Sequence, residues 1–245
     1  MQIYSSTDIG LQRKLNEDYY DNYVTDDFAL MVVADGMGGH NAGEIASELA
    51  VKSFIYFFKE NLDKFDNYQD LIKECISYSN GIIYDESHNN EDLLNMGTTI
   101  VVALVKGNSL YIANVGDSRA YFLNEYGFRQ LSKDHSLVND LLLSGTITEE
   151  EARNYVQKNV ITKSLGAEEK VEPEMLAIDI EKNDMVLLCT DGLNGMLEDF
   201  EIQEILKKDL TLEEKVNELI DLSLDRGGFD NITISLLEIE EESKQ

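Results

Sequence analysis

One stretch decides how the rest of this sequence is interpreted: Phe28-Ala29-Leu30-Met31-Val32-Val33-Ala34-Asp35-Gly36-Met37-Gly38-Gly39-His40. Its run of seven apolar residues predicts a β-strand that is buried on both faces. Asp35 then stands at the end of this strand, before a glycine-rich turn. Burying a carboxylate is costly unless a cation meets it. Because no Lys or Arg occurs between Phe28 and Val51, the stretch points to a metal ion beside Asp35.

The composition is that of a globular protein. The chain has 245 residues, of which 43% are hydrophobic and 28% charged, and it contains a single proline. We find no linker-like segment and no repeat, so we expect one domain over residues 1–245. The formal net charge of −28 argues against nucleic-acid binding, which needs a basic surface.

The expected location is the cytoplasm. Cys75 and Cys189 lie within apolar patterns, which favours free, buried thiols in a reducing compartment. The sequence shows neither a signal-peptide pattern at its start nor an apolar run of membrane-spanning length. We therefore expect no membrane association, and a monomer by default.

Apolar periodicity predicts the elements around the opening stretch. Residues 2–8 form a short edge strand, and residues 10–18 are irregular. Helical spacing of apolar residues predicts helices over 42–58, 71–83, 198–208 and 212–226. Alternating apolar residues predict strands over 98–105, 109–115, 118–123, 128–131, 175–180, 185–190 and 232–239.

Successive strands without intervening helices predict antiparallel pairing, and we expect the strands between 98 and 131 to form a meander. The predicted fold is α+β, a four-layer α-β-β-α sandwich in which helices flank two central antiparallel sheets. Residues 136–168 break the strand pattern with short helical pieces and turns, which predicts a surface flap, a common place for substrate contact.

Four carboxylates lie at or next to the ends of predicted strands. Asp35 and Asp191 end buried strands, Asp117 follows a strand, and Asp230 precedes one. Any one of them alone is explained as a turn residue, but four at strand ends would repel one another unless a cation intervened. Ligand sets made of oxygen atoms suit Mg²⁺, Mn²⁺ or Ca²⁺ better than zinc.

The chain resembles the metal-dependent Ser/Thr protein phosphatases of the type-2C (PPM) family, most of all its compact bacterial members. The resemblance runs from Thr7 to Leu237 and rests on the order and spacing of several motifs. These are Arg13-x-x-Asn16-Glu17-Asp18, Asp35-Gly36-Met37-Gly38-Gly39-His40, Gly97-Thr98-Thr99, Asn114-Val115-Gly116-Asp117-Ser118-Arg119, Asp134-His135-Ser136, Thr190-Asp191-Gly192 and Asp230-Asn231.

The resemblance implies a site for two Mn²⁺ or Mg²⁺ ions. Asp35 would bridge them. Glu17 and the backbone carbonyl of Gly36 would bind one ion. Asp191 and Asp230 would bind the other.

The same resemblance assigns further roles. Asp117, with Asp191, would form a weaker third metal site, and Asp18 would order metal-bound waters. A water bridging the two ions would attack phosphorus in line, without a phosphoenzyme intermediate. Arg13 would bind phosphate oxygens bidentately. His40 would protonate the departing serine or threonine oxygen.

Several positions, most of them in the flap, depart from the family pattern. Many bacterial relatives carry His-Pro where this chain has Tyr155-Val156, and arginine where it has Lys163. Phe229 replaces a frequent proline before Asp230. Ser136, Tyr155 and Lys163 are candidate substrate contacts.

The expected function is hydrolysis of phosphoserine and phosphothreonine in proteins, opposing a bacterial Ser/Thr kinase. One alternative is a dedicated phosphatase for a single regulatory phosphoprotein, such as an anti-sigma-factor antagonist. Another is a catalytically silent binding module of the same fold. The complete set of metal ligands argues against a silent module, and the lack of a recognisable sensor or partner domain favours the general phosphatase.

Overall fold

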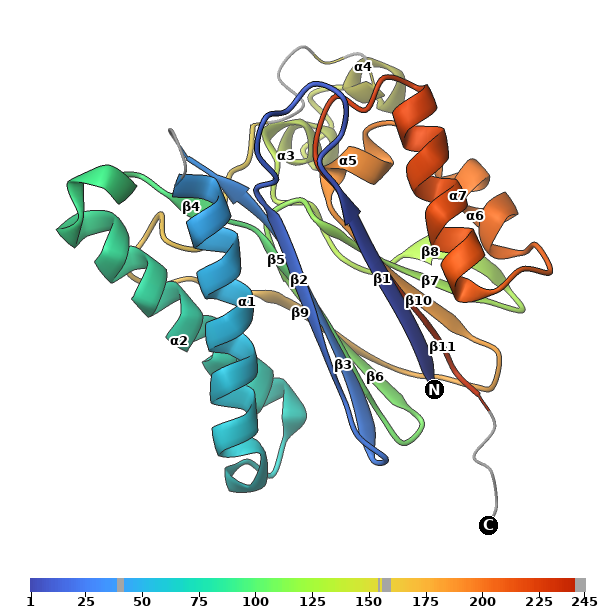
Figure 1. The fold of residues 1–245 in the computed structure, drawn as a ribbon, viewed down its shortest axis with the longest axis horizontal. Coiled ribbons are helices and arrows are strands. Elements are labelled where there is room, and N and C mark those ends of the chain that lie inside the picture. The colour runs from blue at the N-terminus through green and yellow to red at the C-terminus, as the bar shows by residue number, and fades with distance from the viewer. Residues whose placement is uncertain (39–41, 154, 156–159, 241–245) are drawn as a thin grey trace.

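The structure is a computed structural model, and it describes residues 1–38, 42–153, 155 and 160–240. Two antiparallel sheets pack face to face, and helices cover both outer faces (Figure 1). This arrangement confirms the predicted α+β fold with four layers.

The first sheet has six strands. Its order is β2-β3-β5-β6-β9, and β4 pairs with the end of β3. The strands are β2 (Asp18–Val24), β3 (Phe28–Met37), β4 (Gly97–Thr98), β5 (Ile100–Lys106), β6 (Ser109–Val115) and β9 (Glu174–Asp179). Its outer face is covered by α1 (Ala42–Asn61) and α2 (Tyr68–Asn89), which are followed by single 3₁₀ turns at Leu62–Lys64 and Glu91–Leu93.

The second sheet has five strands in the order β1-β11-β10-β7-β8. These are β1 (Gln2–Asp8), β11 (Ile232–Glu238), β10 (Met185–Cys189), β7 (Arg119–Asn124) and β8 (Gly127–Gln130). Its outer face is covered by α6 (Asp199–Leu206) and α7 (Leu212–Asp225). The four-residue helix α5 (Asp191–Asn194) lies between β10 and α6.

Strand β3 shows why its sequence is apolar without interruption. Alternate residues of a strand point to opposite faces of the sheet. Leu30, Val32 and Ala34 pack against the helices, whereas Met31 and Val33 pack between the two sheets. Both faces are therefore core, and the predicted burial of the strand is confirmed.

Capping residues set where several helices begin. The Thr211 hydroxyl accepts the N–H of Glu214 at 3.2 Å, and the Glu214 carboxylate accepts the N–H of Thr211 at 2.8 Å. Thr148 and Glu151 make the same reciprocal pair at the start of α4 (Glu149–Arg153). Both capping boxes follow from the sequence pattern.

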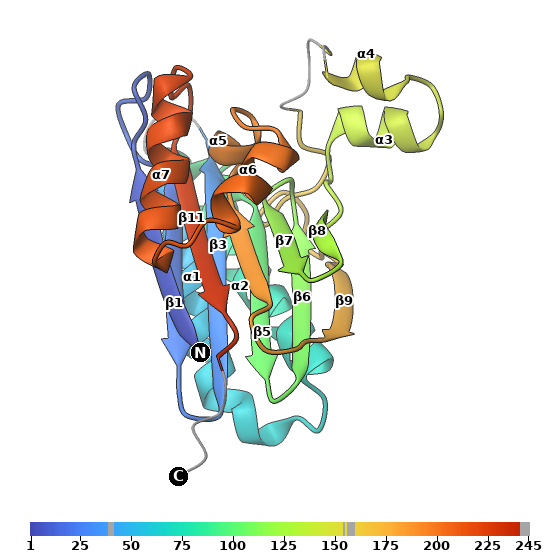
Figure 2. The ribbon, with the colours of Figure 1, turned by 90° about the vertical axis from the view of Figure 1, so that its right-hand side faces the viewer.

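The flap departs from the layered body between β8 and β9 (Figure 2). It carries α3 (Leu137–Leu143) and α4, and its two ends are held together by an isolated bridge between Ser136 and Ile161. The insertion predicted for residues 136–168 is confirmed.

Three details of the sequence prediction were wrong or incomplete. Strand β2 was missed, because it is an edge strand whose side chains are mostly half-buried or exposed and carry little apolar signal. The predicted meander is wrong, because β6 and β7 belong to different sheets and the chain changes sheets at Gly116–Ser118. The prediction that Asp191 ends a strand is wrong, because β10 ends at Cys189 and Asp191 begins the short helix α5, with Thr190 as its N-cap.

Cys75 and Cys189 are buried free thiols, as predicted, and burial raises the pKa of both. Within the described residues, the helices are all too short or too polar to cross a lipid bilayer.

Candidate active site

The predicted acids come together at one end of the molecule. Asp18 begins β2 and lies directly opposite Asp35 of β3 in the strand register. Asp117 lies where the chain crosses between the sheets, Asp191 begins α5, and Asp230 lies two residues before the start of β11. Figure 1 shows α5, β4 and the β1–β2 loop at this end, away from both chain termini.

The acids of this cluster act on one another's charge. Burial, and then the charges of Asp18, Asp191, Asp117 and Asp230, raise the pKa of Asp35 well above its usual range. Burial also raises the pKa of Asp18 to about 7 and the pKa of Asp117 to about 7, and Asp191 contributes to both shifts. Ionising all these groups together is unfavourable, and a bound cation would reverse that penalty.

Backbone contacts hold Asp35 in place. Its N–H donates to the hydroxyl of Thr99 at 2.9 Å, and its carbonyl accepts the Thr99 N–H at 2.8 Å. The hydroxyl of Thr98 donates to the same carbonyl at 2.8 Å. The Thr99 hydroxyl also lies 2.7 Å from that of Ser118, which follows Asp117. The Gly97-Thr98-Thr99 motif therefore couples two predicted metal-binding segments.

Asp18 is held by the other sheet. The hydroxyl of Thr190 donates to Oδ2 of Asp18 at 2.8 Å and accepts the Thr233 N–H at 3.0 Å. Oδ1 of Asp18 and Oδ1 of Asp117 are buried, and neither has a hydrogen-bond partner among the described residues. Buried carboxylate oxygens without donors are suited to a cation or its bound waters.

Gly43 has no side chain, and this leaves space between Glu17 and Gly36. The Gly36 N–H donates to the Glu17 carbonyl at 2.9 Å, and the Glu17 N–H donates to Oδ1 of Asn231 at 2.8 Å. A Cβ added at Gly43 would overlap Oε1 of Glu17 and lie 3.0 Å from the carbonyl oxygen of Gly36. Gly43 thus keeps open the gap between two oxygens that were predicted to bind the same ion.

These observations fit Mn²⁺ or Mg²⁺, which prefer oxygen ligands. In the part of the chain that the structure describes, no three or more Asp, Glu, His or Cys side chains are already arranged so that they could hold an ion. One contact helps to explain this: Arg13 donates to Oδ2 of Asp230 at 2.6 Å and lies 3.7 Å from Oε2 of Glu17. The assignment of individual ligands stays a prediction.

Ser136, Tyr155 and Lys163 were predicted to contact substrate, and His40 was predicted to donate a proton. Ser136 is buried and caps α3 by accepting the Asn139 N–H at 3.3 Å. Tyr155 is half-buried, and the ammonium of Lys163 donates to the backbone carbonyl of Glu172 at 3.1 Å. His40 lies outside the described residues.

A cleft of about 820 Å³ opens beside the acids. The flap helices form one wall, and α5 with the start of α6 forms the other. Asp117, Asp191 and Asp230 lie among its lining residues, as does Ser136, whereas Tyr155 and Lys163 do not. The cleft is therefore continuous with the candidate metal centre.

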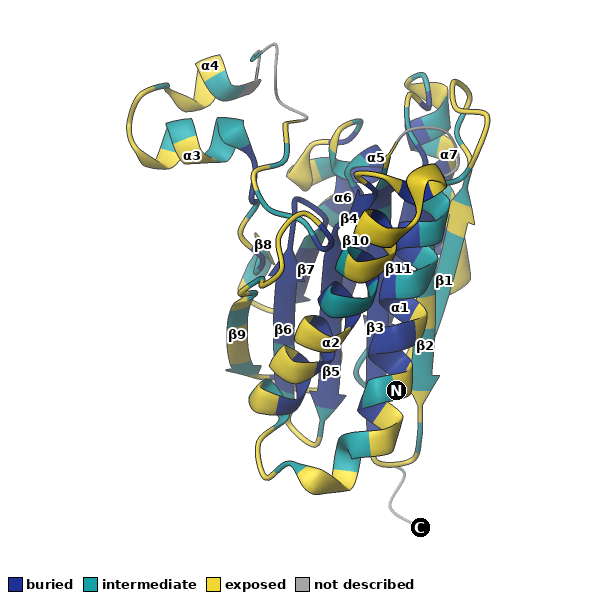
Figure 3. Ribbon diagram, turned by 90° about the vertical axis from the view of Figure 1, so that its left-hand side faces the viewer, coloured by how far each residue is buried: buried dark blue, intermediate teal, exposed yellow. Residues whose placement is uncertain are grey.

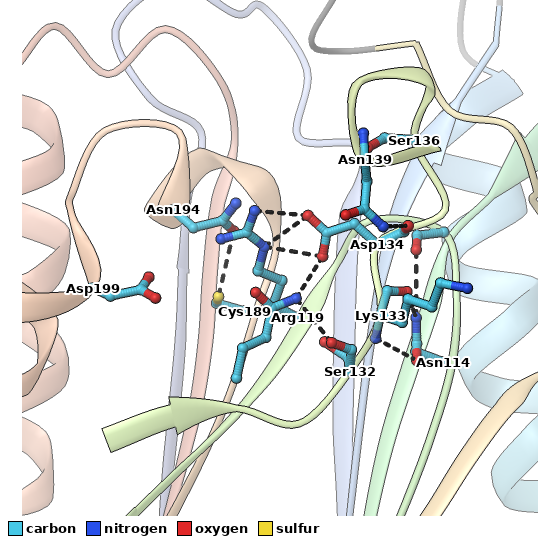
Figure 4. Close-up of polar contacts among 12 residues, drawn as sticks. Asn114, Arg119, Ser132, Lys133, Asp134, Ser136, Asn139, Cys189, Asn194 and Asp199 are labelled. Atoms are coloured by element: carbon cyan, nitrogen blue, oxygen red, sulfur yellow. Dashed lines mark hydrogen bonds and ion pairs between the residues drawn. The ribbon is translucent and has the colours of Figure 1, made fainter. Parts of the chain in front are cut away.

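An ion pair forms part of the cleft lining (Figure 4). Arg119 donates to both carboxylate oxygens of Asp134, at 3.0 Å and 2.7 Å to Oδ2 and 3.1 Å to Oδ1. Arg119 also donates to the hydroxyl of Tyr121 at 2.9 Å, and this hydroxyl donates to Asp199 at 3.0 Å. The network ties the base of the flap to β7 and to α6.

Several residues of the site carried no predicted role. Thr99, Asn231, Arg119 and Asp134 stand in the motifs, but their contacts depend on the folded chain. Gly43 had one signal: a glycine in the first turn of an amphipathic helix disfavours the helix relative to alanine, which suggests a close approach.

Comparisons with known proteins show the family to which the chain belongs. The family described as Protein phosphatase 2C matches residues 12–228. A serine/threonine phosphatase Stp of Listeria monocytogenes is 41% identical over 237 residues, which cover 95% of this chain and 93% of that protein.

Solved structures are also similar. The serine/threonine phosphatase of S. agalactiae superposes with a TM-score of 0.91 at 37% identity, covering 98% of this chain and 99% of that one. The catalytic domain of the phosphatase PstP, solved in complex with 2 manganese ions, superposes with a TM-score of 0.86 at 32% identity, covering 98% of both chains. The chain belongs to the protein phosphatase 2C family, and it is a protein serine/threonine phosphatase that acts on phosphoproteins.

Proposed function

We propose that this phosphatase works with two Mn²⁺ or Mg²⁺ ions held by the acids described above. The observation that supports this most is the cluster of carboxylates around Asp35, which together with burial raises the pKa of Asp35 well above its usual range. Asp35 would contact both ions, with Glu17 and the Gly36 carbonyl on one side. Asp191 and Asp230 would lie on the other.

When bound, the ions would supply an activated water and Lewis acidity toward the phosphate. Side chains of the protein would bind the phosphate, order water and donate a proton. Arg13, which is 44% exposed at its side chain, would turn from Asp230 to bind phosphate oxygens. Asp18 would order waters beside the ions, and His40 would protonate the leaving oxygen. Asp117 and Asp191 would hold a third, weaker ion.

The proposed setting is a bacterial cytoplasm, where this enzyme would act as a monomer opposing a Ser/Thr kinase. The relatives support a bacterial setting, since they include phosphatases of Listeria monocytogenes and S. agalactiae. We propose a single phosphatase domain over residues 1–245.

The test compares metal-dependent hydrolysis of p-nitrophenyl phosphate and phosphothreonine peptides in wild type, Asp35→Ala and Asp191→Ala. We expect each variant to lose about 1000-fold or more in kcat/KM, because it removes a ligand of the ions that drive the reaction. Asp66→Ala is the matched control, since Asp66 is an exposed carboxylate in the loop before α2. Wild-type turnover that survives complete removal of divalent metal would refute the proposal.

A further inference from the structure

We propose that the cleft between the flap and α5–α6 binds the substrate segment that flanks the phosphorylated residue, and that it selects basic side chains there. This inference rests on the proposed phosphatase function. It adds a sequence preference that the family assignment does not contain.

The first support is an apolar surface that is partly exposed among the described residues. Five of the seven residues of α3 are Leu or Val, yet none of its residues is buried. Val138 and Leu142 line the cleft, and the burial colouring shows the flap helices in the colours of partial or full exposure (Figure 3). Phe229, which is 59% exposed, also lines the cleft. Such an apolar surface at an active site suits a bound polypeptide segment.

The second support is the charge of the cleft. Its described lining contains seven carboxylates and one guanidinium. The carboxylates are Asp117, Asp134, Glu149, Asp191, Glu198, Asp199 and Asp230. The guanidinium is that of Arg119, which is already paired with Asp134. The described lining therefore offers no free positive charge to an acidic substrate segment.

Most of these carboxylates already have a role. Asp117, Asp191 and Asp230 belong to the proposed metal centre at the inner end, where the phosphate would lie. Asp134 accepts from Arg119 (Figure 4), and Asp199 accepts from the Tyr121 hydroxyl. The two remaining carboxylates are glutamates that can also reach a ligand.

Glu149 and Glu198 are these two glutamates, and they come from opposite walls. Glu149 lies in the first turn of α4, whereas Glu198 caps the start of α6. Both are exposed, and neither forms an ion pair within 4.0 Å among the described residues, although the charge of Glu198 acts on Arg226, which pairs with Glu201. A lysine or arginine of the substrate would pack its aliphatic stem on Phe229 or Leu142 and direct its charge to these carboxylates. An acidic residue at the same place would be repelled.

The test uses phosphothreonine peptides that are identical except for their flanking residues, which are lysine in one and glutamate in the other. The measured quantity is the ratio of kcat/KM for the two peptides within one enzyme preparation, so that a general loss of activity cancels. We expect wild type to prefer the lysine peptide about tenfold, and Glu149→Gln and Glu198→Gln each to lower the ratio about two- to fivefold.

Glu60→Gln is the control variant, since Glu60 is an exposed carboxylate near the end of α1, on the far side of the first sheet. It should leave the ratio unchanged. High salt should shrink the wild-type ratio, because it screens exposed charges. Equal turnover of the two peptides by wild type, or an unchanged ratio in both cleft variants, overturns this inference while the phosphatase function stands. Failure of wild type to hydrolyse either peptide with Mn²⁺ would instead refute the proposed function.

Discussion

Arg13 donates a 2.6 Å hydrogen bond to Oδ2 of Asp230, so the residue proposed to bind phosphate is paired with a residue proposed to bind metal. The side chains are 44% and 26% exposed. An ion pair that water can reach contributes little net free energy. Exchange of Asp230 for a phosphate group on Arg13 is therefore inexpensive, and a metal ion would take up the freed carboxylate.

Replacing Arg13 should show whether it binds the phosphate of the substrate without supporting metal binding. We expect Arg13→Ala to raise the KM for phosphothreonine peptides about tenfold or more, because charge-assisted hydrogen bonds to phosphate are lost. Arg13→Lys should recover only part of this loss, because a lysine cannot bind bidentately. Calorimetry should show Mn²⁺ binding at least as tight in Arg13→Ala as in wild type. Weaker binding would mean that Arg13 supports the metal ligands.

The buried acids predict how stability depends on pH. Burial raises the pKa of Asp18 and of Asp117 to about 7 in the folded protein, from an ordinary value of 3.8. Between these values the folded state binds more protons than the unfolded state. The free energy of unfolding without divalent metal should therefore fall as pH rises from about 4 to 7. Urea unfolding in the presence of a chelator, at pH 5 and at pH 8, measures this.

Asp117→Asn isolates the contribution of one group, because asparagine does not ionise. Its stability should decline less between pH 5 and pH 8 than that of wild type, with Asp66→Asn as the exposed control. Mn²⁺ binding at pH 6 should also release protons, seen as a calorimetric heat that depends on the buffer. A variant with the wild-type pH slope would show that Asp117 is ionised without cost.

Much of the layered fold could be predicted from local patterns. The apolar run of β3 indicates two buried faces, and its alternation assigns Leu30 and Met31 to different cores. Pairing between strands could not be predicted in the same way. Strands β6 and β7 have the same period whether or not they share a sheet, and only the turn at Gly116, with its φ of +103°, separates them.

Acids of the candidate site could be predicted where they follow an apolar strand pattern. Asp35 and Asp191 stand out because a carboxylate follows an apolar run. The contacts that position them were not predictable, because they join distant segments: Thr190 reaches Asp18 and Asn231 reaches Glu17. The cleft walls depend on how the flap packs, which no local pattern specifies.

The proposed role of His40 predicts a dependence on the leaving group. A serine or threonine alkoxide needs a proton as it leaves, whereas p-nitrophenolate needs little help. We expect His40→Ala to lose about 100-fold in kcat with phosphothreonine peptides and much less with p-nitrophenyl phosphate. Equal losses on both substrates would remove the general-acid role.

A pair of glycine substitutions tests whether the gap at Gly43 serves metal binding. Both Gly43 and Gly81 lie within helices, where alanine is normally favoured by about 0.5–1 kcal/mol. A Cβ at Gly81 meets nothing within 4 Å, so Gly81→Ala should stabilise the protein and leave Mn²⁺ binding unchanged. A Cβ at Gly43 overlaps the Glu17 carboxylate, so Gly43→Ala should weaken Mn²⁺ binding. Calorimetric titration and urea unfolding of both variants measure this, and equal Mn²⁺ affinity in the two variants would show that the gap has no role in holding the ion.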